Sequence, residues 1–222
     1  MHMAILSRFS TLPALALLIA NTPALFDRLY RYEWYKSPLT DWLDTLNVGE
    51  NAKLLELGCG PGNFAHDIAS KGVAVTAMDQ SEKMIKKATG GNGAVEFLVG
   101  DATQTGLGAE QFDFVLSSSL INVVPDGKQL LVEVARVLRP GGTASVLFPT
   151  PKFNSAHAER IIADYRCGVF AAGALRLWAS KARKLDPRKV CDSFEDCGFE
   201  AANVSSFLDG GLAAVTGKKK SA

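Results

Sequence analysis

Short apolar runs alternate along most of the chain with segments whose apolar positions recur every three or four residues. The runs, which predict strands buried on both faces, are Leu54–Leu57, Val73–Met78, Val95–Val99, Phe112–Ser117 and Thr143–Phe148. The clearest helical face follows Pro125 and consists of Leu130, Leu131, Val134, Val137 and Leu138. Such alternation predicts an α/β fold with an open, mostly parallel sheet that has helices on both faces.

The pattern changes near the C-terminus. Asp186 and Pro187 are residue types that begin helices, and Gly198 follows the predicted end of this helix. Two strand-like segments come next, near Glu200–Phe207 and Leu212–Thr216, joined by a short turn that contains two glycines. We therefore expect seven strands and a C-terminal hairpin, with an antiparallel strand on an otherwise parallel edge.

Two segments lie outside this core. Residues 1–46 are expected to form an N-terminal helical cap, and residues 47–222 form the main domain with an insertion at about 149–185. Ligands of open α/β sheets bind at the carboxyl ends of the strands. Because the insertion begins at such an end, we expect it to act as a lid over a ligand.

Composition and charge exclude several classes. With 47% hydrophobic and 21% charged residues, a chain of 222 residues can form a full core. The net charge of +1 provides no electrostatic surface for nucleic acid, and Lys218–Lys220 is expected to be a solvated tail. The four cysteines form no CxxC pair, so we predict no metal site.

The N-terminus contains an apolar run, Leu12–Ala20, preceded by Arg8. This run is much shorter than the ~20 residues of a membrane span, and no Ala-x-Ala cleavage site follows it. We expect a helix that packs on the domain of a cytoplasmic protein with no stable membrane insertion. A membrane-surface contact and a signal peptide are the alternatives.

The most informative segment is the loop after the first predicted strand. Glycines occupy positions 58, 60 and 62, between Glu56 and a helix that is expected to begin near Asn63. Glycine permits backbone angles closed to other residues and lets a ligand approach the backbone. A plain strand-to-helix turn would also explain this loop by itself.

The ends of the next three strands favour a ligand site. Asp79, 23 residues after Glu56, is placed to accept both hydroxyls of a ribose. Asp101 follows the third strand, where a carboxylate can accept from an adenine amino group. Ser117 and Ser118 end the fourth strand, under the centre of the cleft.

The loop chemistry distinguishes two kinds of nucleotide. Nicotinamide dinucleotide sites use GxGxxG and bind a pyrophosphate, whereas this loop has GxGxG, and no Arg or Lys lies between Glu56 and Ile68. S-adenosylmethionine (SAM) has no phosphate and carries a cationic sulfonium and amine. A carboxylate at Glu56 suits that ligand.

These motifs, in this order and spacing, resemble those of the class I SAM-dependent methyltransferases from Leu46 to Gly217. The resemblance implies a Rossmann-like sheet, SAM as cofactor and S-adenosylhomocysteine as its product. It also implies a set of cofactor-binding residues: Glu56, Gly58, Cys59, Gly60, Gly62, Asp79, Gln80, Asp101, Ala102, Ser117 and Ser118. Among them, Glu56 would hold the amino group, Asp79 the ribose, and Asp101 with Ala102 the adenine.

The acceptor side is less defined. Many relatives have a histidine pair after the fourth strand, but this chain has Leu120–Pro125, in which Asn122 can only orient a group. Phe26, Tyr30 and Trp34 share one face of an expected N-terminal helix. The candidate catalytic residues are His157, Tyr30 and Tyr35; further acceptor contacts could come from Tyr165, Arg166 and Trp178.

The sequence thus predicts methyl transfer by in-line displacement to N, O or S of a small molecule, by a monomer or homodimer. A methyltransferase that acts on a peptide or lipid head group is one alternative. A non-catalytic SAM-binding regulatory module is another, because its loop would look the same.

Overall fold

The computed structural model describes residues 11–90 and 93–221, and its strands form one seven-stranded sheet. The sheet order is β3-β2-β1-β4-β5-β7-β6. In chain order the strands are β1 Lys53–Leu57, β2 Ala74–Asp79, β3 Val95–Val99, β4 Phe112–Ser118, β5 Leu138–Pro149, β6 Phe199–Phe207 and β7 Leu212–Lys219. Strands β1 to β5 pair in parallel, whereas β7 runs antiparallel to both of its neighbours. The Rossmann-like, mostly parallel sheet with its C-terminal hairpin is therefore confirmed.

The position of the antiparallel strand differs from the prediction, because β7 lies one place inside the edge and β6 forms the edge itself. Residues Leu212–Val215 of β7 are buried without interruption, as expected for a strand inside a sheet that is covered on both faces. Strand β6 has mostly exposed or half-buried residues and a register irregularity between Glu200 and Asn203. These features suit an edge strand.

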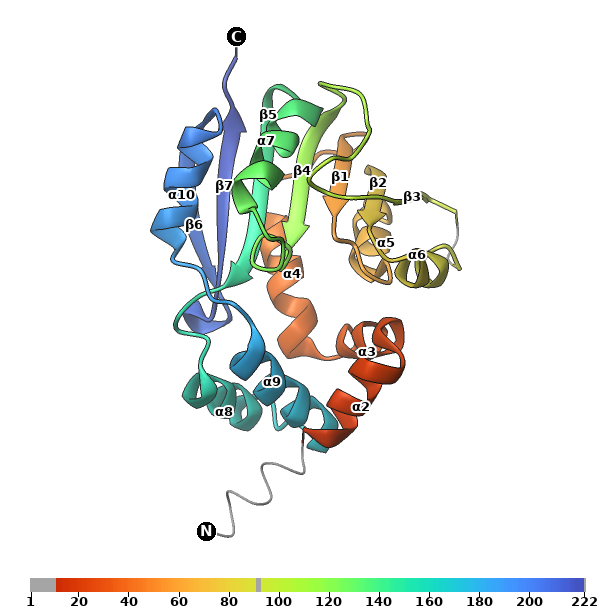
Figure 1. The fold of residues 1–222 in the computed structure, drawn as a ribbon, viewed down its shortest axis with the longest axis vertical. Helices are drawn as coiled ribbons and strands as arrows, with labels where there is room; N and C mark the ends of the chain where they lie inside the picture. The colour runs from red at the N-terminus through yellow and green to blue at the C-terminus, as the bar shows by residue number, and fades with distance from the viewer. Residues whose placement is uncertain (1–10, 91–92, 222) are drawn as a thin grey trace.

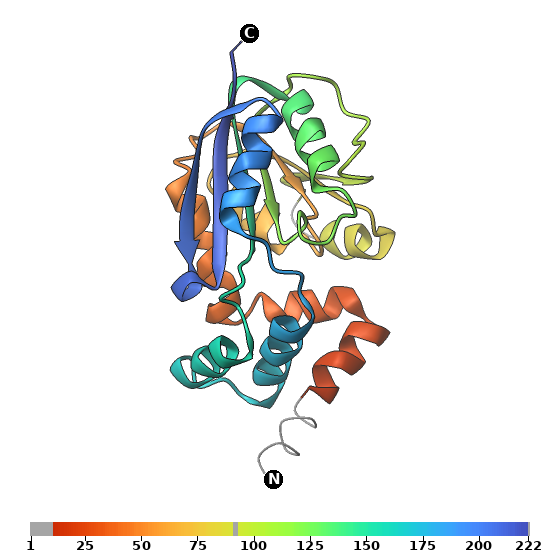
Figure 2. The same cartoon turned by 60° about the vertical axis from the view of Figure 1, so that its left-hand side comes forward.

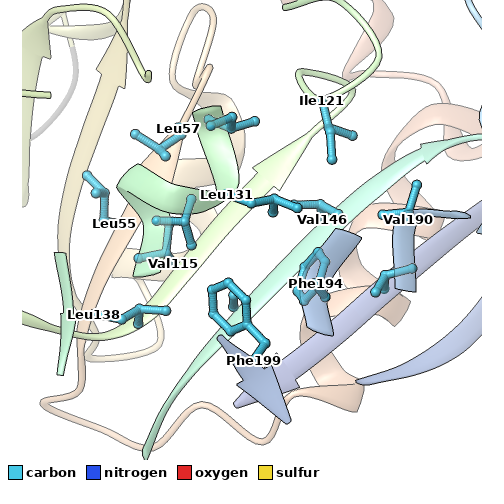
Figure 3. Close-up of a cluster of buried hydrophobic side chains, with 14 of the residues drawn as sticks. Leu55, Leu57, Val115, Ile121, Leu131, Leu138, Val146, Val190, Phe194 and Phe199 are labelled. Atoms are coloured by element: carbon cyan, nitrogen blue, oxygen red, sulfur yellow. The ribbon is translucent and has the colours of Figure 1, made fainter. Parts of the chain in front are cut away.

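Helices cover both faces of the sheet. One face carries α7 (Gly127–Val137) and α10 (Pro187–Asp196). Their apolar side chains pack on the sheet in a cluster that includes Leu131 and Phe194 (Figure 3). The other face is covered by the helices α4 (Glu33–Thr45), α5 (Asn63–Ala69) and α6 (Glu82–Ala88).

Four more helices form a second unit, here named the helical lobe: α2 (Leu12–Ala20), α3 (Thr22–Leu29), α8 (Ser155–Asp164) and α9 (Val169–Lys181). The N-terminal helices and the insertion share one apolar cluster, in which Trp34 and Phe153 are buried. Figures 1 and 2 show this lobe beyond the carboxyl ends of the parallel strands. The two ends of the insertion meet where Leu185 N donates to Pro149 O at 3.0 Å.

The predicted single face of Phe26, Tyr30 and Trp34 is wrong, because the chain bends between two helices. Helix α3 ends at Leu29, and α4 begins at Glu33 after an extended residue. The bend lets Trp34 enter the core of the helical lobe, while the later part of α4 packs on the sheet. There the indole Nε1 of Trp42 donates to Ser145 Oγ at 2.8 Å. The cap is thus α2, α3 and the start of α4.

Within residues 11–90 and 93–221, no helix combines the length and the apolar character needed to cross a bilayer. The alternatives of a membrane-surface contact and a signal peptide depend partly on residues 1–10, which lie outside the described residues.

Candidate functional site

The glycine loop between β1 and α5 has the backbone that only glycine adopts easily. Gly58, Gly60 and Gly62 have φ of +75°, +55° and +79°. A Cβ on Gly62 would lie 2.7 Å from the side chains of Ala88 and Phe97, so this glycine permits close packing. A Cβ on Gly60 would meet nothing within 4 Å in the described structure. The backbone at Gly60 is therefore open to a ligand.

We predict that Gly62→Ala lowers the free energy of unfolding by roughly 3 kcal/mol, because it adds crowding to an unfavourable φ. The matched control is Gly106→Ala, where φ is +72° but a Cβ has open space. That variant should lose only about 1 kcal/mol. Urea denaturation of both variants measures the difference, and equal losses would contradict the role of packing at Gly62.

The carboxylate of Asp79, at the end of β2, holds the glycine loop in place. Its Oδ2 accepts from Gly60 N and its Oδ1 accepts from Ser81 N, both at 2.9 Å. Each oxygen has a second lone pair for a further donor, such as a hydroxyl. Gln80 is exposed beside it. The structure thus places Asp79 directly against the open glycine of the loop.

Glu56 is a buried carboxylate next to this loop. It is 4% exposed, and its Oε2 has no hydrogen-bond partner within the described structure. Burial, and then the charge of Asp79, raise the pKa of Glu56 to about 8. An unpartnered buried carboxylate is costly, so it indicates a site for a cation or a hydrogen-bond donor.

Tyr30, Tyr35 and Cys59 gather around Glu56. For Tyr35 and Cys59, burial raises the pKa most and the charge of Glu56 raises it further, whereas for Tyr30 the hydrogen bond to Asp67 and its charge follow burial and exceed the effect of Glu56. The pKa of Tyr35 is raised to about 12, so both phenols stay protonated at neutral pH. Tyr30 Oη donates to Asp67 Oδ2 at 2.8 Å. These tyrosines can donate hydrogen bonds but are poor general bases.

A narrow pocket of about 10 Å³, with room for about one water, lies between the helical lobe and the ends of β4 and β5. Its walls are formed by Trp34, Tyr35, Leu39, Ser118, Ser119, Leu147, Trp178 and Leu212. The Nε1 of Trp34 is buried and has no partner among the described residues, and the same holds for the neighbouring Ser117 Oγ. Ser119 has φ of +54°, an unusual backbone of the kind often found at functional sites.

His157, expected at the acceptor, has a different place. It is 1% exposed on α8, and both ring nitrogens have partners at 3.0 Å: Leu208 O at Nε2 and Arg160 at Nδ1. Burial is the main cause that lowers its pKa. It joins the helical lobe to the turn before β7 and does not line the pocket. A role as base thus finds no support in its surroundings.

The remaining predicted residues lie near the strand ends beside the glycine loop or on the helical lobe. Asp101 is exposed at the end of β3, where its Oδ1 accepts from Thr103 N and Oγ1, both at 2.8 Å. These bonds lower the pKa of Asp101. Ala102 is half-buried beside it. Of the further acceptor candidates, Trp178 lines the pocket, whereas Tyr165 and Arg166 are exposed on the lobe.

Four of the pocket residues were not predicted as site residues: Ser119, which directly follows the predicted Ser118, and the leucines Leu39, Leu147 and Leu212. Each of these leucines looks like an ordinary core leucine in the sequence. No group of three or more possible metal ligands occurs in the described part of the chain.

Comparison with known proteins places the loop in a recognised domain. Residues 55–146 match the family described as "Methyltransferase domain". The chain is 35% identical over 106 residues to the malonyl-[acyl-carrier protein] O-methyltransferase of Salmonella typhimurium, covering 47% of this chain and 42% of that protein. It is 36% identical over 121 residues to the ubiquinone biosynthesis O-methyltransferase of Caulobacter vibrioides, covering 52% and 48%. The chain thus spans less than half of the length of either relative.

The fold is also that of solved proteins of this type. A SAM-dependent methyltransferase from Aquifex aeolicus superimposes with a TM-score of 0.65 at 17% identity, over 88% of this chain and 97% of that one. The matched residues 55–146 include the glycine loop and Asp79, whereas Trp34, Tyr35 and Trp178 lie outside them. The similarity in sequence therefore covers the glycine loop and Asp79 but not the aromatic wall of the pocket.

Proposed function

We propose that this chain, which belongs to the class I SAM-dependent methyltransferase family, transfers the methyl group of SAM to a nitrogen, oxygen or sulfur atom of a small molecule. The acceptor would bind in the pocket between the helical lobe and the sheet. One observation carries this proposal: the unpartnered Oε2 of the buried Glu56, beside the open Gly60 and Asp79.

The residues present fit SAM. Its amino group would donate to Glu56, its ribose hydroxyls to Asp79, and the open space at Gly60 would receive the methionine part. Ser117, whose Oγ is also unpartnered, would close the methionine side. Asp101 and Ala102 would hold the adenine at the next strand end. When bound, SAM supplies a methyl group that is already activated by its sulfonium.

The task left to the chain is to orient the acceptor and to exclude water. The rings of Trp34, Tyr35 and Trp178 have centroids 5.7–6.3 Å apart and form the apolar wall of the pocket. Trp34 Nε1 and the hydroxyls of Ser118 and Ser119 can hold a polar group of the acceptor. Because the pocket has room for about one water, its two walls would have to separate for any acceptor to enter.

The pocket walls contain no carboxylate, histidine or lysine from the described residues. A nucleophile that needs no proton removed by the enzyme is therefore favoured, such as a neutral amine, a thiolate or a carboxylate. This supports small amines, thiols and acids over simple alcohols as acceptors.

The test is calorimetric titration of the purified protein with SAM and with S-adenosylhomocysteine, followed by assays of methyl transfer from labelled SAM to a panel of such acceptors. Micromolar binding followed by methylation of one class would support the proposal. Folded protein that binds neither ligand would overturn it, and binding without turnover on any acceptor would favour the regulatory module.

A further inference from the structure

The helix α2 has an outer face that the described structure leaves uncovered. Its sequence, Leu12–Ala20, contains no charged residue. Ala14 is buried against the helical lobe, with Leu17 and Leu18 packed beside it. On the opposite side, Leu12 is 51% exposed and Ile19 is 78% exposed, seven positions apart and thus on one stripe of the helix. The helix is apolar all round, yet only one of its sides packs against the rest of the described structure.

Other apolar side chains extend this face. Val169, at the start of α9, is 69% exposed, and Tyr165 is exposed on the connection from α8. Helices α2 and α9 are in contact, and Figures 1 and 2 show the start of both at the end of the molecule away from the sheet. Half of the exposed large hydrophobic side chains in the described residues belong to α2, to α9 or to the connection between α8 and α9. We name Leu12, Ile19, Tyr165 and Val169 the apolar end of the lobe.

The charges around the apolar end are mainly positive. Arg28 lies over the Phe170 ring, 3.7 Å from its centroid, and Arg166 is exposed between α8 and α9, with Asp164 beside it. Residues 1–26 contain no acidic residue, and their basic residues are His2 and Arg8. The segment that leads into α2 includes Met3, Ile5, Leu6 and Phe9, which are as apolar as the helix.

We propose that the apolar end of the lobe docks on the surface of an anionic lipid bilayer, with α2 lying in the interface. Apolar side chains bind such a surface by entering the boundary between head groups and acyl chains. Nearby arginines add attraction to the anionic head groups. The nine residues of α2 by themselves are too few to span a bilayer, so the proposal is a contact at its surface. Docking would bring the lobe that walls the acceptor pocket to the membrane, and it does not depend on methyl transfer.

The test is flotation of the full-length protein with vesicles of phosphatidylcholine containing about one-third phosphatidylglycerol, and with phosphatidylcholine alone. The variant carries Leu12→Glu and Ile19→Glu, both exposed positions. The matched control carries Val132→Glu and Val204→Glu, which are comparably exposed on α7 and β6. We expect the wild type and the control to float with the anionic vesicles, and the lobe variant to bind at least ~tenfold more weakly.

Three results would overturn the inference. The wild type and the lobe variant could bind the vesicles equally, or not at all. Light scattering could show a dimer that the lobe variant dissociates, which would mean that a second copy covers the face. The lobe variant could melt well below the control without lipid, which would mean that this chain covers the face itself. SAM titration of the same variants tests the proposed function separately.

Discussion

Asp79→Ala is expected to raise the dissociation constant for SAM at least about a hundredfold. The carboxylate would accept hydrogen bonds from both ribose hydroxyls, and hydrogen bonds to charged groups contribute roughly 1.5–3 kcal/mol each. Two of them amount to about 3 kcal/mol or more, which is two factors of ten in affinity. The variant also frees Gly60 N and Ser81 N, so the loop loses its anchor. Calorimetric titration measures the change.

The control for this prediction is Asp113→Ala. Asp113 is also a strand carboxylate with backbone and side-chain partners, since it accepts from Lys53 N and pairs with Arg139, both at 2.8 Å. It lies at the amino end of β4, whereas the glycine loop follows the carboxyl end of the parallel strand β1. This variant should lose stability and keep its affinity for SAM. A dissociation constant of Asp79→Ala within threefold of the wild type would remove Asp79 from the cofactor site.

Glu56→Gln is expected to weaken SAM binding at least about thirtyfold at pH 8 and to remove its pH dependence. The pKa of Glu56 is about 8 in the free protein, so most molecules are protonated at pH 7. The amino group of SAM needs the ionised carboxylate. Wild-type affinity should therefore rise about fiftyfold from pH 6 to pH 8. A wild-type profile as flat as that of the variant would contradict this role.

Glu56 also makes the stability of the wild type depend on pH. Stability should fall as the pH rises, whereas the affinity for SAM should increase. The raised pKa means that the folded state holds a proton that the unfolded chain has released above pH ~4.5. That contribution to stability is complete below the unfolded pKa and is lost as the pH rises through about 8. Glu56→Gln should thus match the wild type near pH 5 and melt at a higher temperature at pH 8. Thermal denaturation at both pH values measures this.

Glu133 offers the matched control because its pKa moves the other way. Hydrogen bonds from Arg136, more than those from Thr105, lower the pKa of Glu133 to about 2. Its contribution is present above the unfolded pKa and is lost as the pH falls through the folded value. Glu133→Gln should therefore be less stable than the wild type at both pH 5 and pH 8, with unchanged affinity for SAM.

The placement of the three carboxylates at neighbouring strand ends could be predicted because the strands are visible in the sequence as apolar runs. Glu56, Asp79 and Asp101 each come directly at or after an apolar run, and the topology of a parallel sheet brings such ends to one edge. The local apolar pattern and the acidic residue types were sufficient to predict this arrangement.

The acceptor half could not be predicted in the same way. Leu39, Leu147 and Leu212 come from three distant segments and have no chemistry that distinguishes them from core leucines. The bend at residues 30–32 separates Tyr30 from Trp34. The spacing of apolar residues is helical on both sides of the bend, so the pattern predicted one continuous helix. The partners of His157, Leu208 and Arg160, come from other turns and elements, and no sequence pattern pointed to them.

The helical lobe also sets an order for folding during synthesis. Its apolar cluster comes from two parts of the chain, within residues 12–34 and 153–179. These parts are separated by more than a hundred residues that contain the strands β1 to β5. Contacts between such distant segments carry a high loop-closure cost and form late unless the intervening chain is already compact. The N-terminal helices thus leave the ribosome long before their partners exist. A nascent chain that ends before Trp178 would carry a complete glycine loop but would lack one wall of the pocket between the lobe and the sheet.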